Sequence, residues 1–203
     1  DTLTRSKKVM PFPVDINMTD FFFNYGLRIN PTLVKDVKKF ALLKLVTGEV
    51  GGNPQYTKLP WPYFPLGIAE NNHPITKNIN PVKFEFPTSI DTLGGKKFKT
   101  NVLFVFSERT LLKQVPNYVQ LDEIASVDSL GQMEKPSTPK IFAVALEGKF
   151  SSAYASRIER QNYPGFKATS PENKMIVIAD GDVGRNKVMK GQALPLGIDM
   201  FTD

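Results

Sequence analysis

Apolar positions along the chain fall into short runs, each about as long as one β-strand and separated from the next by polar residues. The runs are Leu33–Val37, Ala41–Val46, Val82–Phe86, Val102–Phe106, Ile141–Leu146 and Met175–Ala179. The last three are almost uninterrupted in apolar character, which is typical of strands covered on both faces. The pattern therefore predicts an α/β layered domain with a mainly parallel or mixed central sheet.

One stretch, residues 18–26, carries a clear helical signal. Thr19 is suited to cap its first turn, and Gly26 is suited to end it in the left-handed conformation. Weaker patterns indicate further helices at residues 151–161 and 182–189. These helices would cover the sheet that the apolar runs predict.

The segment KLPWPYFPLG, residues 58–67, combines three prolines with Trp61, Tyr63 and Phe64. Proline fixes φ and lacks a backbone donor, so we expect an extended, polyproline-like segment that is not a central strand. Extended chain points successive side chains in different directions, so the three aromatic rings are not all expected to be buried by one contact. Two interpretations follow: an aromatic plug that seals the fold, or a docking patch for a partner or a second copy.

Length, charge and cysteine content limit the functions that this protein can have. A length of 203 residues suits a single domain, which we place at 1–203, and no apolar run is long enough to span a membrane. The net charge of +6 is scattered along the chain, which disfavours a nucleic-acid partner. The absence of cysteine excludes thiolate catalysis and Cys-ligated zinc. Because the chain does not begin with Met, we expect it to be a fragment of a longer protein.

The sharpest chemical motif is the strand-like run that ends in Asp180-Gly-Asp182. Ligands gather beyond the carboxyl ends of strands in open α/β sheets, and two carboxylates there are suited to Mg²⁺. Glu147 follows another apolar run and would line the same rim. The structural alternative is that Asp182 caps a following helix and Asp180 pairs with Arg185. Two carboxylates are few ligands for a metal, so we predict none and no other cofactor.

The only histidine, His73, lies in the turn-forming sequence Asn-Asn-His-Pro. No G-x-S-x-G elbow is present to supply a serine nucleophile for it. We therefore interpret His73 as a turn residue whose ring bonds to nearby backbone, and we predict no catalytic residue.

Several motifs, taken in series, resemble the GldG family, the gliding-motility-associated auxiliary proteins of ABC transporters in Bacteroidetes. They run in the family's order from about residue 10 to the C-terminus. The motifs are FNYGLRIN (23–30), PWPYFPL (60–66), HPITKN (73–78), SID (89–91), LEGKF (146–150), ADGDVGRN (179–186) and LPLGID (194–199).

The resemblance implies an extracytoplasmic domain on the periplasmic side of the bacterial inner membrane. Its longer parent would be anchored by transmembrane segments outside this sequence and would work with a permease and an ATPase subunit. The resemblance also implies a flavodoxin-like or amidotransferase-like fold. It carries over no catalytic residue and no cofactor, and self-association is a further expectation.

Two classes of function therefore stay open. The first is a non-catalytic auxiliary module of an ABC-type transport system, linked to gliding motility or envelope export. The second is a hydrolase or sugar-modifying enzyme that uses Asp180, Asp182 and Glu147 as paired carboxylates. Carboxylates spaced over a cleft would favour the enzyme, and carboxylates held in caps and Arg pairs would exclude it.

Overall fold

We analysed a computed structural model, which describes residues 6–70, 73–94, 98–133, 135–157 and 163–197. The described residues form a protein built mainly of antiparallel β-strands. The strands are β1 (Lys8–Val9), β2 (Leu27–Ile29), β3 (Thr32–Asp36), β4 (Phe40–Val50), β5 (Asn53–Ala69), β6 (Val82–Lys83), β7 (Ile90–Thr92), β8 (Lys99–Val105), β9 (Thr110–Gln114), β10 (Val119–Gln120), β11 (Ile141–Ser151), β12 (Thr169–Ile178), β13 (Val188–Met189) and β14 (Gln192–Ala193). The helical elements are α2 (Thr19–Asn24), the 3₁₀ helix η1 (Leu121–Ser126) and α3 (Val127–Met133).

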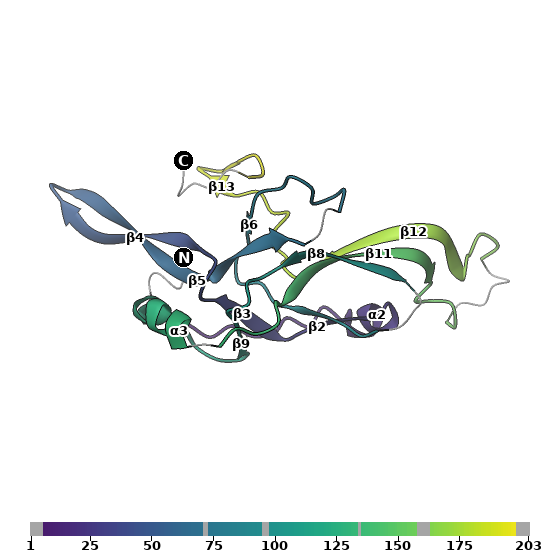
Figure 1. Cartoon of the computed structure of the whole chain (residues 1–203). Helices are drawn as coiled ribbons and strands as arrows, with labels where there is room; N and C mark the ends of the chain where they lie inside the picture. Colours follow the sequence, from purple (N-terminus) through teal and green to yellow (C-terminus); the bar gives the residue numbers. More distant parts are fainter. Residues whose placement is uncertain (1–5, 71–72, 95–97, 134, 158–162, 198–203) are drawn as a thin grey trace.

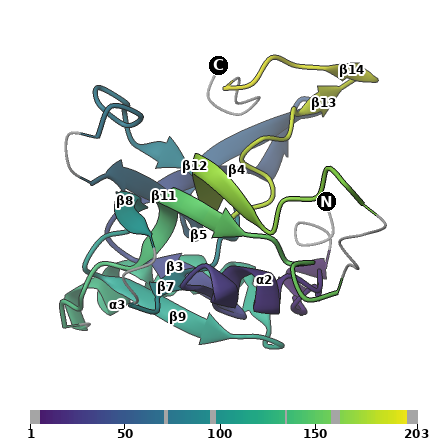
Figure 2. The same ribbon diagram turned by 90° about the vertical axis from the view of Figure 1, so that its right-hand side faces the viewer.

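The largest sheet has eight strands in the order β2-β7-β11-β8-β5-β4, with β12 also paired to β11 and β6 to β5. Two-stranded ribbons join β3 to β9, β1 to β10 and β13 to β14. In both views α2, β3 and β9 lie beneath β8, β11 and β12, so the body has two layers (Figures 1 and 2). The hairpin of β4 and β5 leaves the body at one end (Figure 1).

The predicted α/β class with a parallel or mixed sheet, flavodoxin-like or amidotransferase-like, is wrong. Every strand pairing that the structure describes is antiparallel. Parallel neighbours need long crossovers, usually through a helix. Here α2 and α3 have six and seven residues. Residues 153–157 and 181–184 form turns rather than the predicted helices, and residues 158–161 lie outside the described part.

The uninterrupted run in β11 reflects cover on both faces, as the sequence suggests, although the strand is antiparallel to its neighbours. Phe142, Val144 and Leu146 alternate with Ala143 and Ala145, and all five are buried. The pattern is therefore large against small rather than apolar against polar, which fits close packing on both faces of an antiparallel strand. These residues belong to the main core, together with Leu27, Phe84, Leu103, Phe106 and Val177.

The predicted helix at 18–26 is confirmed, with one difference at its start. Met18 occupies the N-cap position of α2 and makes no side-chain capping bond, so Thr19 is not the cap. Gly26 follows the helix with φ of 76°, the left-handed conformation expected of it. Tyr25 closes the helix and donates a hydrogen bond from its hydroxyl to the backbone oxygen of Ser151, 2.7 Å away, which ties α2 to the end of β11.

Candidate functional site

The proline-aromatic segment lies in β5, and most of it is a plug. Trp61 and Tyr63 are both 0% exposed and pack with Leu33 and Val119 in a second core, while Phe64 is half-buried at its edge. The segment is extended, as predicted. β5 as a whole lies between β4 and β8, but only Ile68 and Ala69 pair with β8. Residues 58–65 pair with β4 alone, which agrees with the expectation that the proline-rich stretch is not a central strand.

Irregular pairing explains how β5 accommodates its prolines. Pro60 lies opposite Leu42 and Pro65 opposite Phe40, so residues 61–64 of β5 face only Ala41 across the ladder. At this register shift the ladder of hydrogen bonds is already interrupted, so the backbone N–H groups that proline lacks are not needed there. Residues 61–64 are thus free of regular pairing with β4, and the rings of Trp61 and Tyr63 lie in the core.

A partly buried ionic cluster surrounds the hydroxyl of Tyr63. Glu123, from η1, accepts hydrogen bonds from Lys35 Nζ of β3 at 2.7 Å and Lys113 Nζ of β9 at 2.9 Å. The Tyr63 hydroxyl donates to Glu123 at 2.8 Å and accepts from Lys113 at 3.0 Å. The cluster therefore joins β3, β5, β9 and η1 around one carboxylate.

The charges in this cluster stabilise one another. Burial alone would raise the pKa of Glu123, but hydrogen bonds from Lys35, Lys113 and Tyr63 outweigh it and lower that pKa to about 2. Burial, followed by the negative charge of Glu123, raises the pKa of Tyr63 above its usual range. A carboxylate and a neutral phenol are thus fixed at the root of the β4–β5 hairpin.

Beyond this root, residues 44–58 form what we call the arm, a two-stranded projection visible in Figure 1. It turns at Gly51 and Gly52, whose φ values of 59° and 82° suit a tight hairpin turn. At about 3.3 Å per residue the arm reaches roughly 20 Å from its root. Val46 is 59% exposed and Tyr56 is 54% exposed, so apolar side chains on the arm face solvent.

One face of the arm combines these apolar side chains with positive charge. Val46 pairs with Tyr56, and Lys44 lies directly opposite Lys58. Side chains two residues apart share a face, so all four lie on the same side of the ribbon. Lys44 Nζ also lies 4.9 Å from the centroid of the Tyr56 ring, a cation–π contact.

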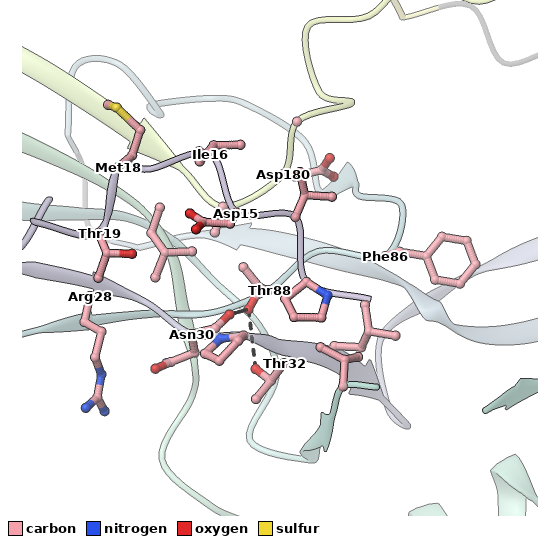
Figure 3. Close-up of a pocket in the computed structure, with 18 of the residues that line it drawn as sticks. Asp15, Ile16, Met18, Thr19, Arg28, Asn30, Thr32, Phe86, Thr88 and Asp180 are labelled. Atoms are coloured by element: carbon pink, nitrogen blue, oxygen red, sulfur yellow. Dashed lines mark hydrogen bonds between the residues drawn. The ribbon is translucent and has the colours of Figure 1, made fainter. Parts of the chain in front are cut away.

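A cavity of about 740 Å³ lies in another part of the molecule. Its walls come from residues 11–18, from α2, β2 and the start of β3, and from segments that follow β6 and β12. Figure 3 shows Asp15 and Asp180 above Asn30, Thr32 and Thr88. Most of the lining is apolar, and the polar groups are set into it at a few positions.

The Asp180-Gly-Asp182 turn forms part of this cavity wall. Asp180 accepts hydrogen bonds from the backbone N–H groups of Asp182 at 2.7 Å and Glu85 at 3.1 Å. Burial raises the pKa of Asp180, and the nearby charges of Asp182 and Glu85 add to this effect. Arg185 pairs with Asp182 at 3.1 Å rather than with Asp180, and no helix follows for Asp182 to cap.

Glu147 does not share this rim. Ala143 of β11 pairs with Ile178 of β12, so Glu147 lies farther along β11, in the direction away from Asp180. At about 3.3 Å per residue the separation along the strands is roughly 15–20 Å. In an antiparallel pair the carboxyl ends lie at opposite edges, which is why the expected common rim does not form.

Glu147 is therefore not paired with the two aspartates, although the enzyme hypothesis required such a pairing. Glu147 accepts a hydrogen bond from Asn101 at 3.2 Å, and Asp182 is engaged by Arg185. Among the described residues, no group of three or more Asp, Glu, His or Cys side chains is placed to hold a metal ion. His73 accepts a hydrogen bond at Nδ1 from the backbone of Ile75, 3.3 Å away, as expected of a turn residue.

Two features of these sites have only a weak signal in the sequence. The ionic cluster is one, although Lys35 and Lys113 each interrupt an apolar stretch that becomes a strand and so signal a buried partner. The wall formed by residues 11–18 is the other. Its prolines at 11 and 13 and its alternating apolar side chains are a faint indication of extended chain.

The described part of the chain contains no helix that is both long and apolar enough to cross a membrane. Comparison with curated proteins and comparison with solved structures each gave no significant match. A sequence profile of the family described as "ABC-type uncharacterized transport system" matches residues 1–203. The match covers the whole chain, so this protein belongs to that family and is an auxiliary component of an ABC-type transport system.

Proposed function

We propose that the chain is a non-catalytic, extracytoplasmic module of the GldG type, and that its arm docks on the permease subunit of the transporter. The observation that carries the proposal is the arm itself, a projecting ribbon with exposed apolar side chains on a buried root. Family membership supplies the transport context. A link to gliding motility or envelope export rests on the resemblance of the sequence motifs.

The chemistry of the arm indicates the surface it fits. Like charges directly opposite each other in a ladder destabilise it, and Lys44 and Lys58 are such a pair. Acidic side chains on a partner would offset this repulsion, while Val46 and Tyr56 bury apolar area beside them. We therefore expect a permease loop in which carboxylates flank apolar residues.

The root makes the arm suitable for binding. Trp61 and Tyr63 are fully buried, and the ionic cluster of Glu123 joins the strands around them. A projection whose base is already ordered loses less conformational entropy on binding. The aromatic segment thus contributes to docking by holding the arm, whereas the docking residues lie farther out.

Two double variants test the docking role. Val46→Ser with Tyr56→Ser removes the apolar side chains of the arm. The matched control is Ile176→Ser with Tyr154→Ser, because these side chains are 50% and 58% exposed at other sites. Both double variants should keep the melting temperature within a few degrees, since exposed substitutions change stability by about 0.5 kcal/mol each.

The readout is recovery of the permease and ATPase with the natural full-length protein from native membranes. We expect the arm variant to lose most of this recovery and the control variant to retain it. Equal recovery with both variants would refute docking through the arm. Protease digestion of intact spheroplasts tests the location, because an extracytoplasmic domain is cleaved there without breaking the inner membrane.

A further inference from the structure

The cavity beside the Asp180 turn has a charge that contrasts with the rest of the protein. The chain carries a net charge of +6, but the cavity is lined by four acidic residues and one basic residue. The acidic residues are Asp15, Glu85, Asp180 and Asp182, and the basic residue is Arg28. Acidic side chains thus outnumber basic ones in the lining of this mainly apolar cavity, although the protein as a whole is basic.

Ion pairs neutralise two of these four acidic residues. Glu85 pairs with Lys187 at 2.7 Å and with Lys83 at 3.3 Å, and Asp182 pairs with Arg185 at 3.1 Å. Arg28 is directed to Asp91 at 2.6 Å, so it is engaged away from the acidic residues of the cavity. Among the residues that the structure describes, Asp15 and Asp180 have hydrogen bonds only from backbone N–H groups and no cationic partner.

Asp180 is held ready for a cation. Two backbone N–H groups fix both of its oxygens, and the residue is half-buried. Burial raises its pKa, which means that its negative charge is poorly compensated in this structure. A positively charged group brought into the cavity would supply the missing compensation, whereas an anion would add repulsion.

The remaining walls suit an apolar body. Val14, Ile16, Met18, Leu27, Ile29 and Phe86 are among the lining residues. A volume of about 740 Å³ falls within the range of roughly 300–1,000 Å³ that is usual for small-molecule sites. Phe86 holds a left-handed backbone with φ of 52°, which is rare for a bulky residue, and strained backbone of this kind concentrates at functional sites.

We propose that this cavity binds a small amphiphile that carries one ammonium group on an apolar body. The ammonium group lies against Asp180, with Asp15 on the same side of the cavity (Figure 3), and the apolar body contacts the apolar wall that includes Ile16 and Leu27. This site is separate from the arm, and it does not depend on the docking role proposed above.

The chain provides its own reporter for binding. Trp61 is the only tryptophan, and its ring centroid lies 6.4 Å from that of Phe86 in an edge contact. Displacement of Phe86 by a ligand should therefore change the fluorescence of Trp61. Isothermal titration calorimetry provides a second readout that does not depend on this contact.

The probes are octylammonium, octyl sulfate and octanol, which share one apolar chain and differ in charge. We expect saturable binding of octylammonium, and binding of octyl sulfate and octanol that is at least about tenfold weaker. Equal binding of all three probes would mean an apolar cavity without charge selection and would overturn the proposal. Absence of saturable octylammonium binding would overturn it as well.

Carboxylate variants locate the cation. Asp180→Asn should weaken octylammonium binding about tenfold, while Glu147→Gln, which removes the same charge at a remote position, should leave it within about twofold. Asp15→Asn, at an exposed position, should weaken it by about threefold and is the test to use if Asp180→Asn fails to fold. Unchanged octylammonium binding in a folded Asp180→Asn variant would contradict the placement of the ammonium group beside Asp180. If Asp180→Asn does not fold, unchanged binding in Asp15→Asn would contradict it.

Discussion

Replacing Glu123 with Gln tests whether the ionic cluster holds the root of the arm together. Gln keeps the size of the side chain but removes the negative charge that Lys35 and Lys113 share. Lys35 is only 7% exposed, so its ammonium group would be left in the protein without an anion. Removing one partner of such a pair is costly, because the remaining charge cannot recover its hydration.

The pKa of Glu123 gives the size of the effect. It falls from an ordinary value of 4.5 to about 2 in the folded protein, and each pKa unit corresponds to about 1.4 kcal/mol, so the charged carboxylate contributes roughly 3 kcal/mol at pH 7. A carboxyl group whose folded pKa is lowered stabilises the protein fully above its unfolded pKa. That contribution is lost as the pH falls from about 4.5 towards 2.

Urea unfolding of the natural protein and of Glu123→Gln between pH 7 and pH 2.5 provides the measurement. We expect the variant to be less stable by roughly 3 kcal/mol at pH 7, and we expect this difference to shrink steadily below pH 4.5. Glu49→Gln, at an exposed position near the tip of the arm, is the control and should change stability by less than about 0.5 kcal/mol. A difference below about 1 kcal/mol at pH 7, or one that does not change with pH, would refute the reasoning.

Three further substitutions test the packing around the two sites. In Gly67→Ala the added Cβ would lie 2.2 Å from Cζ of Phe142, so we expect a loss of at least about 2 kcal/mol in urea unfolding; a loss below about 0.5 kcal/mol would contradict this close approach of β5 to the Phe142 ring. Asp182→Ala breaks only an exposed ion pair with Arg185, so calorimetric unfolding should show a cost of about 0.5 kcal/mol or less, and a cost above about 1 kcal/mol would contradict this assignment. Trp61→Ala removes a fully buried ring and should cost about 3–5 kcal/mol, measured by chemical unfolding followed by circular dichroism; an unchanged midpoint would mean that the plug is not part of the core.

The sequence predicts strand positions well because apolar runs mark them directly. Residues 102–106, 141–146 and 175–179 overlap β8, β11 and β12. The direction of pairing is not encoded in the same way. Ala143 and Ala145 are apolar, so β11 lacks the alternating polar positions that usually indicate an antiparallel strand. Its side chains alternate in size instead, large against small. In β12, Ile176 is exposed, so an apolar run did not require cover on both faces there.

The candidate sites are harder to predict because they depend on contacts between distant segments. Lys35, Lys113 and Glu123 come from three separate elements, and only the fold brings their charges together. The wall of the cavity likewise combines residues near the N-terminus with the turn at Asp180. The plug was predictable, because a buried Trp and Tyr are a common way to fix irregular backbone. The sequence did not, however, indicate which face of the β4–β5 hairpin stays exposed.

Site-specific photocrosslinking from the arm tests the central claim most directly. A photoreactive residue placed at position 46 of the natural full-length protein, with position 176 as the control, would be irradiated in native membranes. We expect a crosslink to the permease subunit from position 46 and none from position 176. A permease crosslink from position 176 alone, or none from either position while the transporter is intact, would contradict docking through the arm.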